Sequence, residues 1–317
     1  MSYTLIYNGE ILNYFTLSSC SWQFRGVDIN MRKEFIAEIL GTFILVFFGC
    51  GSVAVDVISG AHLGLFQVAI VWGIAVNLGI YMVGSISGAH LNPAITIAMA
   101  IFRPKKFPAK KILPYILAQL IGAVFAGLVL YGLFSKTLIS FEAAHNIVRG
   151  QPGSELSAMM FGEYFPNPAI YGTTNAAFSQ VPLLIGMVAE LMGTMFLALG
   201  IFALTDEKKF DSSKKGFRAF TYCIGLVLSI SIIMFAPFSQ AGLNPARDFG
   251  PRLVSYFAGW KNIAIPGANG GFLLVYILAP IAGAILGGCI YKIVAQISPA
   301  KDEPEYGNNK EFIRKVS

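Results

Sequence analysis

Long apolar stretches separated by short polar connections dominate the chain. A helix needs about 20 mostly apolar residues to cross a bilayer, and six stretches meet that requirement: 34–56, 63–84, 110–135, 181–205, 217–237 and 271–297. Two further apolar segments, 92–102 and 244–256, are too short to cross, and each opens on an Asn-Pro pair. The pattern predicts an all-α membrane protein with six transmembrane helices and two half-length re-entrant helices.

The composition agrees with this prediction. Of the 317 residues, 55% are apolar or aromatic and 13% are charged, whereas soluble domains carry about 25% charged residues. These values argue against a soluble enzyme. The four cysteines stand apart, with no pair at the spacing of a metal or redox motif, and no nucleotide-binding or catalytic constellation is present. We expect no cofactor and no bound metal.

Basic residues gather on one side of the predicted bundle. Eighteen of the 23 Lys and Arg residues fall on the side that holds both ends of the chain. Because cytoplasmic connections are the ones enriched in Lys and Arg, we expect a multi-pass protein of the cell membrane with cytoplasmic N- and C-termini. Orientation then explains the net charge of +6, and no nucleic-acid partner is expected.

The chain contains an internal repeat. Phe35–Gly49, FIAEILGTFILVFFG, matches Met187–Ile201, MVAELMGTMFLALGI, at an offset of 152 residues. Ser87–Ala94, SGAHLNPA, matches Ser239–Ala246, SQAGLNPA, at the same offset. Two matching blocks at one offset are hard to produce by chance.

The repeat predicts an inverted arrangement of two halves. Each half, approximately 34–135 and 181–297, holds three spans and one half-length segment, and an extracellular connection, 136–180, joins them. An odd number of spans places the second half upside down in the bilayer. In such inverted repeats the functional site lies near the midplane at the repeat interface.

The two Asn-Pro-Ala triplets predict how the half-length helices begin. Proline suits the first helical position because it has no N–H to leave unpaired, which makes the preceding Asn the N-cap. Each helix N-terminus is equivalent to about half a positive charge, so two of them facing one point would repel cations and protons. The Asn amides could still donate to water or hydroxyl oxygens. The residues concerned are Asn92, Pro93, Ala94, Asn244, Pro245 and Ala246.

The stretches before these caps are expected to be non-helical at membrane depth, which requires that they line a polar cavity or are buried in protein. Their carbonyls would form a ladder of acceptors; the residues are Gly88, Ala89, His90, Leu91, Gln240 and Gly242. Glu38 and Glu190 occupy matching positions within two spans. We expect each carboxylate to accept N–H bonds from the re-entrant stretch of its own half, rather than to act as a proton relay.

The motifs GAHLNPA at 88–94 and GLNPARDFGP at 242–251, the paired AEILGT and AELMGT segments, and the six-plus-two layout resemble the aquaporin superfamily. Asp248 after Arg247, and Tyr-Phe-Pro-Asn-Pro at 164–168, look like its glycerol-facilitator branch. The resemblance covers about residues 32–297. It implies a homotetramer with one pore in each subunit.

The same resemblance implies a selectivity filter of four residues: Trp72, Ile232, Ala241 and Arg247. Glycerol facilitators usually have an aromatic residue where this chain has Ala241. Losing that aromatic should widen or reshape the filter, with Ile232 filling part of the space. The guanidinium of Arg247 would offer donors to solute oxygens, and Trp72 an apolar wall for a carbon backbone.

We therefore expect a passive channel for glycerol and related small neutral solutes, with some water, that excludes ions and protons and is not an enzyme. The alternatives are a channel tuned mainly to water or to another neutral solute, such as urea or an undissociated small acid, and an ion-coupled secondary transporter. The expected organisation is an N-terminal cytoplasmic extension 1–33, a channel domain 34–297 and a cytoplasmic tail 298–317. Met31, followed by Arg32 and Lys33, would be a natural start of its own.

Overall fold

The computed structural model describes residues 6–7, 10–11, 29–206, 214–266 and 271–297. The expected tail 298–317 and most of the expected extension 1–33 lie outside the described residues. Within the extension, two strands of two residues each, β1 (Ile6–Tyr7) and β2 (Glu10–Ile11), pair in antiparallel fashion.

Within the described residues, six helices are long and apolar enough to cross a membrane, which confirms the six predicted spans. The last of them joins a π-helical start, η5, to α11. The helices are α1 (Ile29–Val57), α2 (Leu65–Ser87), α4 (Ile112–Ala144), α8 (Leu183–Leu204), α9 (Lys214–Ser239), η5 (Leu273–Leu278) and α11 (Ala279–Ile297).

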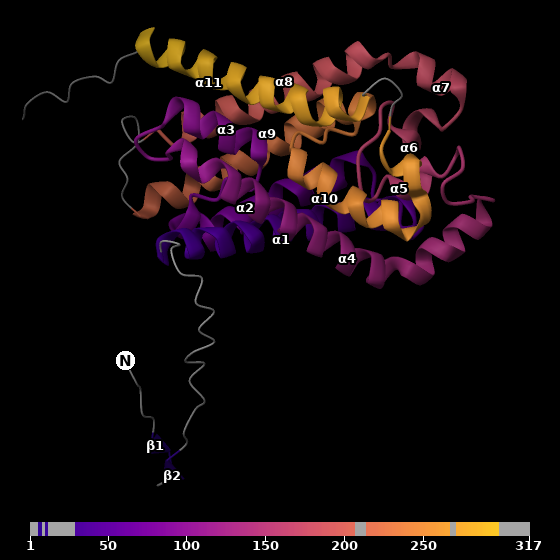
Figure 1. Cartoon of the computed structure of the whole chain (residues 1–317), viewed down its shortest axis with the longest axis horizontal. Helices are drawn as coiled ribbons and strands as arrows, with labels where there is room; N and C mark the ends of the chain where they lie inside the picture. Colours follow the sequence, from indigo (N-terminus) through magenta and orange to yellow (C-terminus); the bar gives the residue numbers. More distant parts are fainter. Residues whose placement is uncertain (1–5, 8–9, 12–28, 207–213, 267–270, 298–317) are drawn as a thin grey trace, which may run out of the picture.

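The two half-length helices are α3 (Pro93–Phe102) and α10 (Pro245–Ser255). In Figure 1 they lie inside the bundle, α3 toward the end where α1 begins and α11 ends, and α10 toward the opposite end. The connections carry the remaining short elements: η1 (Ala109–Lys111), α5 (Glu155–Ala158), α6 (Pro168–Tyr171), α7 (Asn175–Gln180), η2 (Tyr256–Trp260) and η3 (Lys261–Ala264).

Helix contacts follow the predicted repeat. Helix α1 packs on α2 and α4, and α8 packs correspondingly on α9 and α11. Each half-helix packs on the last helix of the other half, α3 on α11 and α10 on α4, while α2 contacts α9 across the centre. Exchanging the two halves maps this set of contacts onto itself, as an inverted repeat requires.

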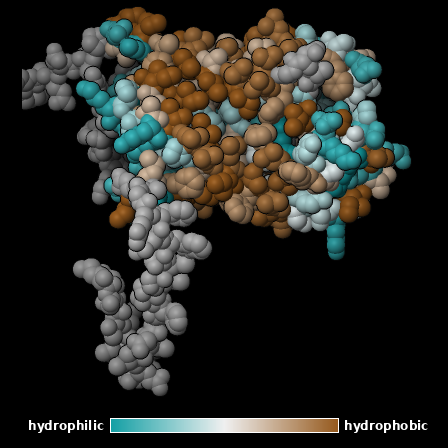
Figure 2. All heavy atoms as spheres, in the orientation of Figure 1, coloured by the Kyte–Doolittle hydropathy of each residue, from teal (hydrophilic) through white to brown (hydrophobic). Residues whose placement is uncertain are grey.

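The surface has the form expected of a membrane protein. Figure 2 shows a broad hydrophobic band across the middle of the face in view, with hydrophilic residues concentrated at its two ends. Large apolar side chains are exposed on the outer faces of the long helices, for example Ile74, Leu133, Leu184 and Ile230, each more than 60% exposed. Lipid chains can cover such a band favourably, whereas its exposure to water would cost free energy.

The connection between the halves differs from the predicted one. Helix α4 continues to Ala144 instead of ending at 135. The carboxylate of Glu142, in its last turn, accepts bonds from Arg149 Nε and Ser157 Oγ, both at 2.9 Å. These bonds pair the Glu142 carboxylate near the helix end. The helix can therefore extend beyond the apolar stretch from which its length was predicted.

Candidate functional site

Helices α3 and α10 begin at a common point inside the bundle. The side-chain oxygen of Asn92 accepts the Ala94 N–H at 2.9 Å, and that of Asn244 accepts the Ala246 N–H at 3.1 Å. In both cases proline is the first helical residue. The two helix N-termini therefore have the cap chemistry expected from the two triplets.

The two caps are joined across the repeat interface. Asn92 Nδ2 donates to the carbonyl of Leu243 at 2.8 Å, and Asn244 Nδ2 donates to the carbonyl of Leu91 at 2.7 Å. An amide NH₂ group has two protons, so each Asn keeps one for another acceptor. Both Asn residues line a cavity, which places those remaining donors where a solute can reach them.

The stretches before the caps have an unusual backbone. Ala89 and Leu91 have φ of 49° and 52°, and their counterparts at the repeat offset, Ala241 and Leu243, have φ of 57° and 53°. Non-glycine residues seldom adopt this left-handed region, so the surrounding structure must hold it. It makes successive peptide groups point in different directions and frees carbonyls from helical bonding.

Two buried carboxylates hold these stretches. Glu38 accepts the N–H groups of His90 and Leu91 at 2.9 and 2.8 Å. Glu190 accepts the N–H groups of Gly242 and Leu243 at 2.7 and 2.6 Å. Each carboxylate also accepts a serine hydroxyl, from Ser87 and Ser239 respectively, so it ties down the donors and leaves the carbonyls of the stretch available.

Two tyrosines, which the sequence analysis did not select, complete this support. Tyr115 donates to the carbonyl of Ser87 at 2.8 Å, and Tyr276 donates to the carbonyl of Ser239 at 3.1 Å. They are related by an offset of 161 residues rather than 152. A search for a second offset in the last helix of each half could have found them.

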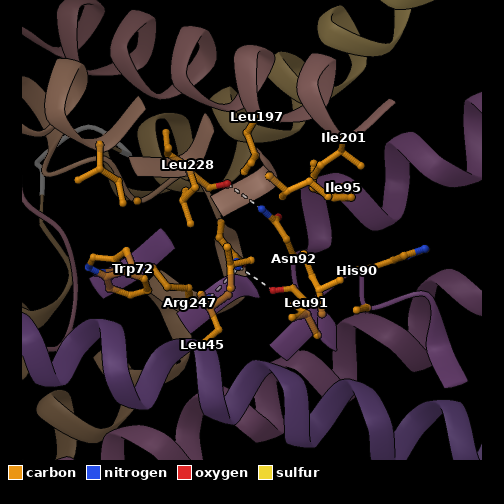
Figure 3. A pocket seen from close by; sticks show the side chains of 18 of the residues that line it. Leu45, Trp72, His90, Leu91, Asn92, Ile95, Leu197, Ile201, Leu228 and Arg247 are labelled. Atoms are coloured by element: carbon orange, nitrogen blue, oxygen red, sulfur yellow. Dashed lines mark hydrogen bonds between the residues drawn. The ribbon is translucent and has the colours of Figure 1, made fainter. Parts of the chain in front are cut away.

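A cavity runs along the half-helix junction. Figure 3 shows Trp72 and Arg247 at one end of it, Asn92 in the middle, and His90, Ile95 and Ile201 toward the other end. A second cavity shares six lining residues with the first: Ile80, Ala89, His90, Ile95, Ile201 and Ile224. This second cavity extends to Leu204 and Thr205 near the end of α8. We call the two adjoining cavities the path.

The four residues that the resemblance assigns to a filter all line the first cavity: Trp72, Ile232, Ala241 and Arg247. The Arg247 guanidinium carbon lies 4.2 Å from the centre of the Trp72 ring, within cation–π range. Gly49 of α1 makes room for that ring, since a Cβ there would lie 2.2 Å from it. The indole and the guanidinium are thus seated against each other at one end of the path.

The expected ladder residues are placed unequally. Ala89, His90, Leu91 and Gly242 line the first cavity, and Gly88 lines the second. Gln240 is absent from both linings within the described part of the chain. Its side chain instead accepts the Tyr164 N–H at 2.9 Å and donates to the carbonyl of Met159 at 3.3 Å, so it anchors the α4–α8 connection.

Arg247 has a charged environment that the sequence analysis missed. Its Nη2 forms an ion pair with Glu163 Oε1, and both side chains are buried. Asp248 Oδ1 accepts the Glu163 N–H at 2.8 Å, and Arg252 donates to the carbonyl of Glu163. At the neighbouring residue, burial raises the pKa of the Tyr164 hydroxyl. The hydroxyl therefore stays protonated and donates to the backbone carbonyl of Ile263 at 2.8 Å.

The path has two chemically different walls. The re-entrant stretches and Asn caps supply carbonyls and amide donors along one line. The facing helices supply aliphatic side chains: Leu45, Val76, Ile80, Leu197, Ile201, Ile224, Leu228 and Ile232. Such a lumen suits a molecule with hydroxyl or amide groups on one edge and CH groups on the other, because it replaces hydration on the polar edge alone.

A third Asn-Pro-Ala triplet provides an internal comparison. Asn167 accepts the Ala169 N–H at 3.0 Å and begins α6, which has only four residues. These residues form one capped helical turn. Its amide donates to the carbonyl of Ala236 at 3.1 Å, and it lines neither of the two cavities described. The triplet alone therefore specifies a helix start, and its position in the repeat decides whether it faces the path.

Within the described ranges, no group of three or more His, Cys, Asp or Glu side chains could hold a metal ion. His90 packs instead against Phe107 and Tyr115, with ring centroids 4.4 and 5.1 Å away.

Comparison with known proteins agrees with the resemblance carried by the sequence motifs. The family model described as major intrinsic protein matches residues 26–291. A glycerol uptake facilitator protein of Pseudomonas aeruginosa is 39% identical over 283 residues, covering 87% of this chain and 95% of its own length. The glycerol uptake facilitator protein of Escherichia coli K12 is 38% identical over 264 residues, 83% of this chain and 88% of its own.

Two further matches extend the comparison. The propanediol uptake facilitator PduF of Salmonella typhimurium is 39% identical over 264 residues, 83% of this chain and 94% of its own. Among solved structures, the aquaglyceroporin from Plasmodium falciparum superposes with a TM-score of 0.68 at 28% identity, covering 84% of this chain and 98% of its own.

Proposed function

The chain belongs to the major intrinsic protein family, and on that premise we propose that it is a passive membrane channel for glycerol and related small neutral solutes, with some water. The three relatives described above, which match this chain over 88–95% of their own length, are named as uptake facilitators for glycerol or propanediol. A passive facilitator leaves its solute chemically unchanged, so no catalytic group is needed.

The observation that carries the proposal is the crossed pair of Asn caps in the middle of a two-walled path. Each Asn amide has one proton engaged with the opposite half, and the other is available to a hydroxyl or water oxygen. Glycerol can exchange its hydration for these donors and for the loop carbonyls while its CH groups pass the aliphatic wall.

Exclusion of cations and protons follows from the same geometry. Two helix N-termini, each equivalent to about half a positive charge, meet at the caps, and a cation would have to pass both without its water. In this proposal Trp72, Ile232, Ala241 and Arg247 form the filter, Asn92 and Asn244 the central constriction, and Glu38 and Glu190 the supports.

Orientation and assembly are part of the proposal. The concentration of Lys and Arg beside the chain ends supports cytoplasmic termini, which would place Arg247 on the outer side of the cell membrane. The exposed apolar faces of the long helices can be covered by lipid and by other subunits of a homotetramer.

Ala241 supports a broader solute range than glycerol alone. Ala241 lines the cavity, as does Ile232, at a position where glycerol facilitators usually have an aromatic ring. We therefore include short diols and urea among the proposed solutes.

Stopped-flow light scattering on proteoliposomes tests the proposal. Vesicles that contain the protein should shrink and then re-swell quickly in a glycerol gradient, and the re-swelling rate should be unchanged when a proton or sodium gradient is imposed. Rapid water movement without glycerol movement would make this a water channel, and flux that depends on an ion gradient would make it a transporter.

A further inference from the structure

Glu163 lies in the connection between α4 and α8, outside every segment that the repeat assigns to the pore. Its side chain is 1% exposed and faces Arg247. Neither carboxylate oxygen has a hydrogen-bond partner among the described residues. Among the described residues, the carboxylate is therefore partnered by its ion pair with Arg247 Nη2.

Helix α10 fixes the backbone of Glu163. Its N–H donates to Asp248, and its carbonyl accepts from Arg252. Arg252 in turn binds both oxygens of Asp248 at 2.8 Å and the carbonyl of Ala264 at 2.7 Å. Gly162 allows this close approach, since a Cβ there would lie 2.4 Å from the Arg252 side chain. The carboxylate is therefore held in place by the same helix that carries Arg247.

The guanidinium of Arg247 is held on two sides. Its face lies against the Trp72 ring, and Nη2 pairs with Glu163. Nη1 has no hydrogen-bond partner among the described residues, and Arg247 lines the cavity. The protons of that buried nitrogen are accepted by no described residue, while the positive charge is balanced beside the path.

We propose that Glu163 is a specificity-determining residue of the filter: its carboxylate cancels the charge of Arg247 and orients the guanidinium so that the filter presents a donor without presenting a net charge. The inference rests on the proposed function, because it takes Arg247 to face the permeating solute. It adds a role for a residue outside the two pore motifs.

The consequence concerns anions. The helix N-termini at the Asn caps repel cations but favour anions, so an unpaired guanidinium at the entrance would make the whole path attractive to a small anion. With Glu163 in place the entrance is neutral, and an anion gains no compensation there for its lost hydration. Glu163 thus keeps the channel selective for neutral solutes.

Urea and nitrate test this inference, because both are planar, three-armed molecules of similar size that differ in charge. In proteoliposomes made conductive to potassium with valinomycin, swelling in potassium nitrate reports nitrate entry, and swelling in urea reports the neutral counterpart. Glu163→Gln keeps the side-chain shape and removes the charge. We expect the ratio of nitrate to urea permeability to rise about tenfold, the change produced by a difference of 1.4 kcal/mol, which is well within the energy of one nearby charge.

Three further variants test whether the charge of Glu163 is what excludes nitrate. Glu163→Asp keeps the charge and should keep nitrate excluded. Glu163→Gln combined with Arg247→Gln has no charge to balance and should return the ratio toward that of the native protein. Glu155→Gln is the matched control, since this buried carboxylate lies in the same connection but caps the Gly153 N–H at 2.7 Å; its ratio should equal the native one.

An unchanged ratio in Glu163→Gln, or an equal rise in Glu155→Gln, would overturn the inference. Should Glu163→Gln fail to insert, the ratio in Glu163→Asp and in the double variant decides, because a purely structural role predicts loss of flux in the double variant rather than native exclusion of nitrate. Failure of the proposed function gives a different result, since the native protein itself would then show no movement of glycerol or urea.

Discussion

Asn244 Nδ2 donates to the backbone carbonyl of Leu91 at 2.7 Å, a bond that joins residues 153 positions apart across the repeat interface. The reciprocal bond from Asn92 to Leu243 has nearly the same length, 2.8 Å. The narrow centre of the path is therefore a shared structure, in which each half supplies the donor that fixes the other half's re-entrant stretch.

Asn92→Asp should damage this centre. A carboxylate can still cap α3 but cannot donate to the Leu243 carbonyl, and it places a negative charge where two helix N-termini exclude cations. We expect glycerol flux to fall severalfold and potassium leakage to appear, measured by re-swelling and by a potassium-sensitive dye. Asn167→Asp, in the triplet away from the two cavities, should retain native flux; equal loss in both variants would contradict the special role of position 92.

Glu190→Gln separates a structural carboxylate from a proton relay. The substituted amide can accept from only one side, so an N–H of Gly242 or Leu243 loses its acceptor, at a cost of about 1–3 kcal/mol. We expect a lower melting temperature in detergent and reduced flux with no change in its pH dependence. A flux that loses an existing pH dependence, with stability unchanged, would instead identify a relay.

Ala241→Phe should narrow the filter. Ala241 is 4% exposed and lines the cavity beside Ile232, so an aromatic ring there has only the path itself to occupy. The rate for urea and for four-carbon polyols should fall more than the rate for glycerol, as measured by re-swelling in each solute. Val188→Phe, on the exposed face of α8, is the control of matched size, and a uniform decrease for all solutes would indicate misfolding rather than filtering.

Gly49→Ala should displace Trp72. The added Cβ would lie 2.2 Å from the indole ring, and that ring backs the Arg247 guanidinium at 4.2 Å. We expect slower glycerol flux and a shift in tryptophan fluorescence, with the amount of inserted protein little changed. Gly132→Ala, in α4 with nothing within 4 Å of the new methyl group, should behave like the native protein; a native-like Gly49→Ala would show that the ring can be moved without effect.

The sequence predicted the fold well because membrane burial leaves a strong signature. The six spans and the two half-helices follow from apolar length and from Asn-Pro at one offset, and the structure confirms them. Glu38 and Glu190 could be selected because an ionisable residue within a span is unusual enough to need an explanation. The functional roles of the filter residues remain predictions.

What the sequence did not reveal lies in the irregular connection. Glu163 pairs with a residue 84 positions away, and no periodicity marks an acidic residue in a polar loop as a partner for a pore arginine. The Gln240 carbonyl was expected in the ladder, which stays a prediction, and the sequence did not indicate that the Gln240 side chain ties down the same connection. Both depend on how a 38-residue segment between Ala144 and Leu183 folds back into the bundle, which local propensity does not determine.

The crossed Asn bonds also impose an order on biogenesis. Leu243, the acceptor of the Asn92 amide, is synthesised 151 residues after Asn92. At a synthesis rate of about 5–20 residues per second, this donor waits on the order of 10 s before its partner emerges. During that interval α3 lacks its partner α10. The unpaired polar groups at the start of α3 must then be bonded by water, lipid headgroups or the insertion machinery.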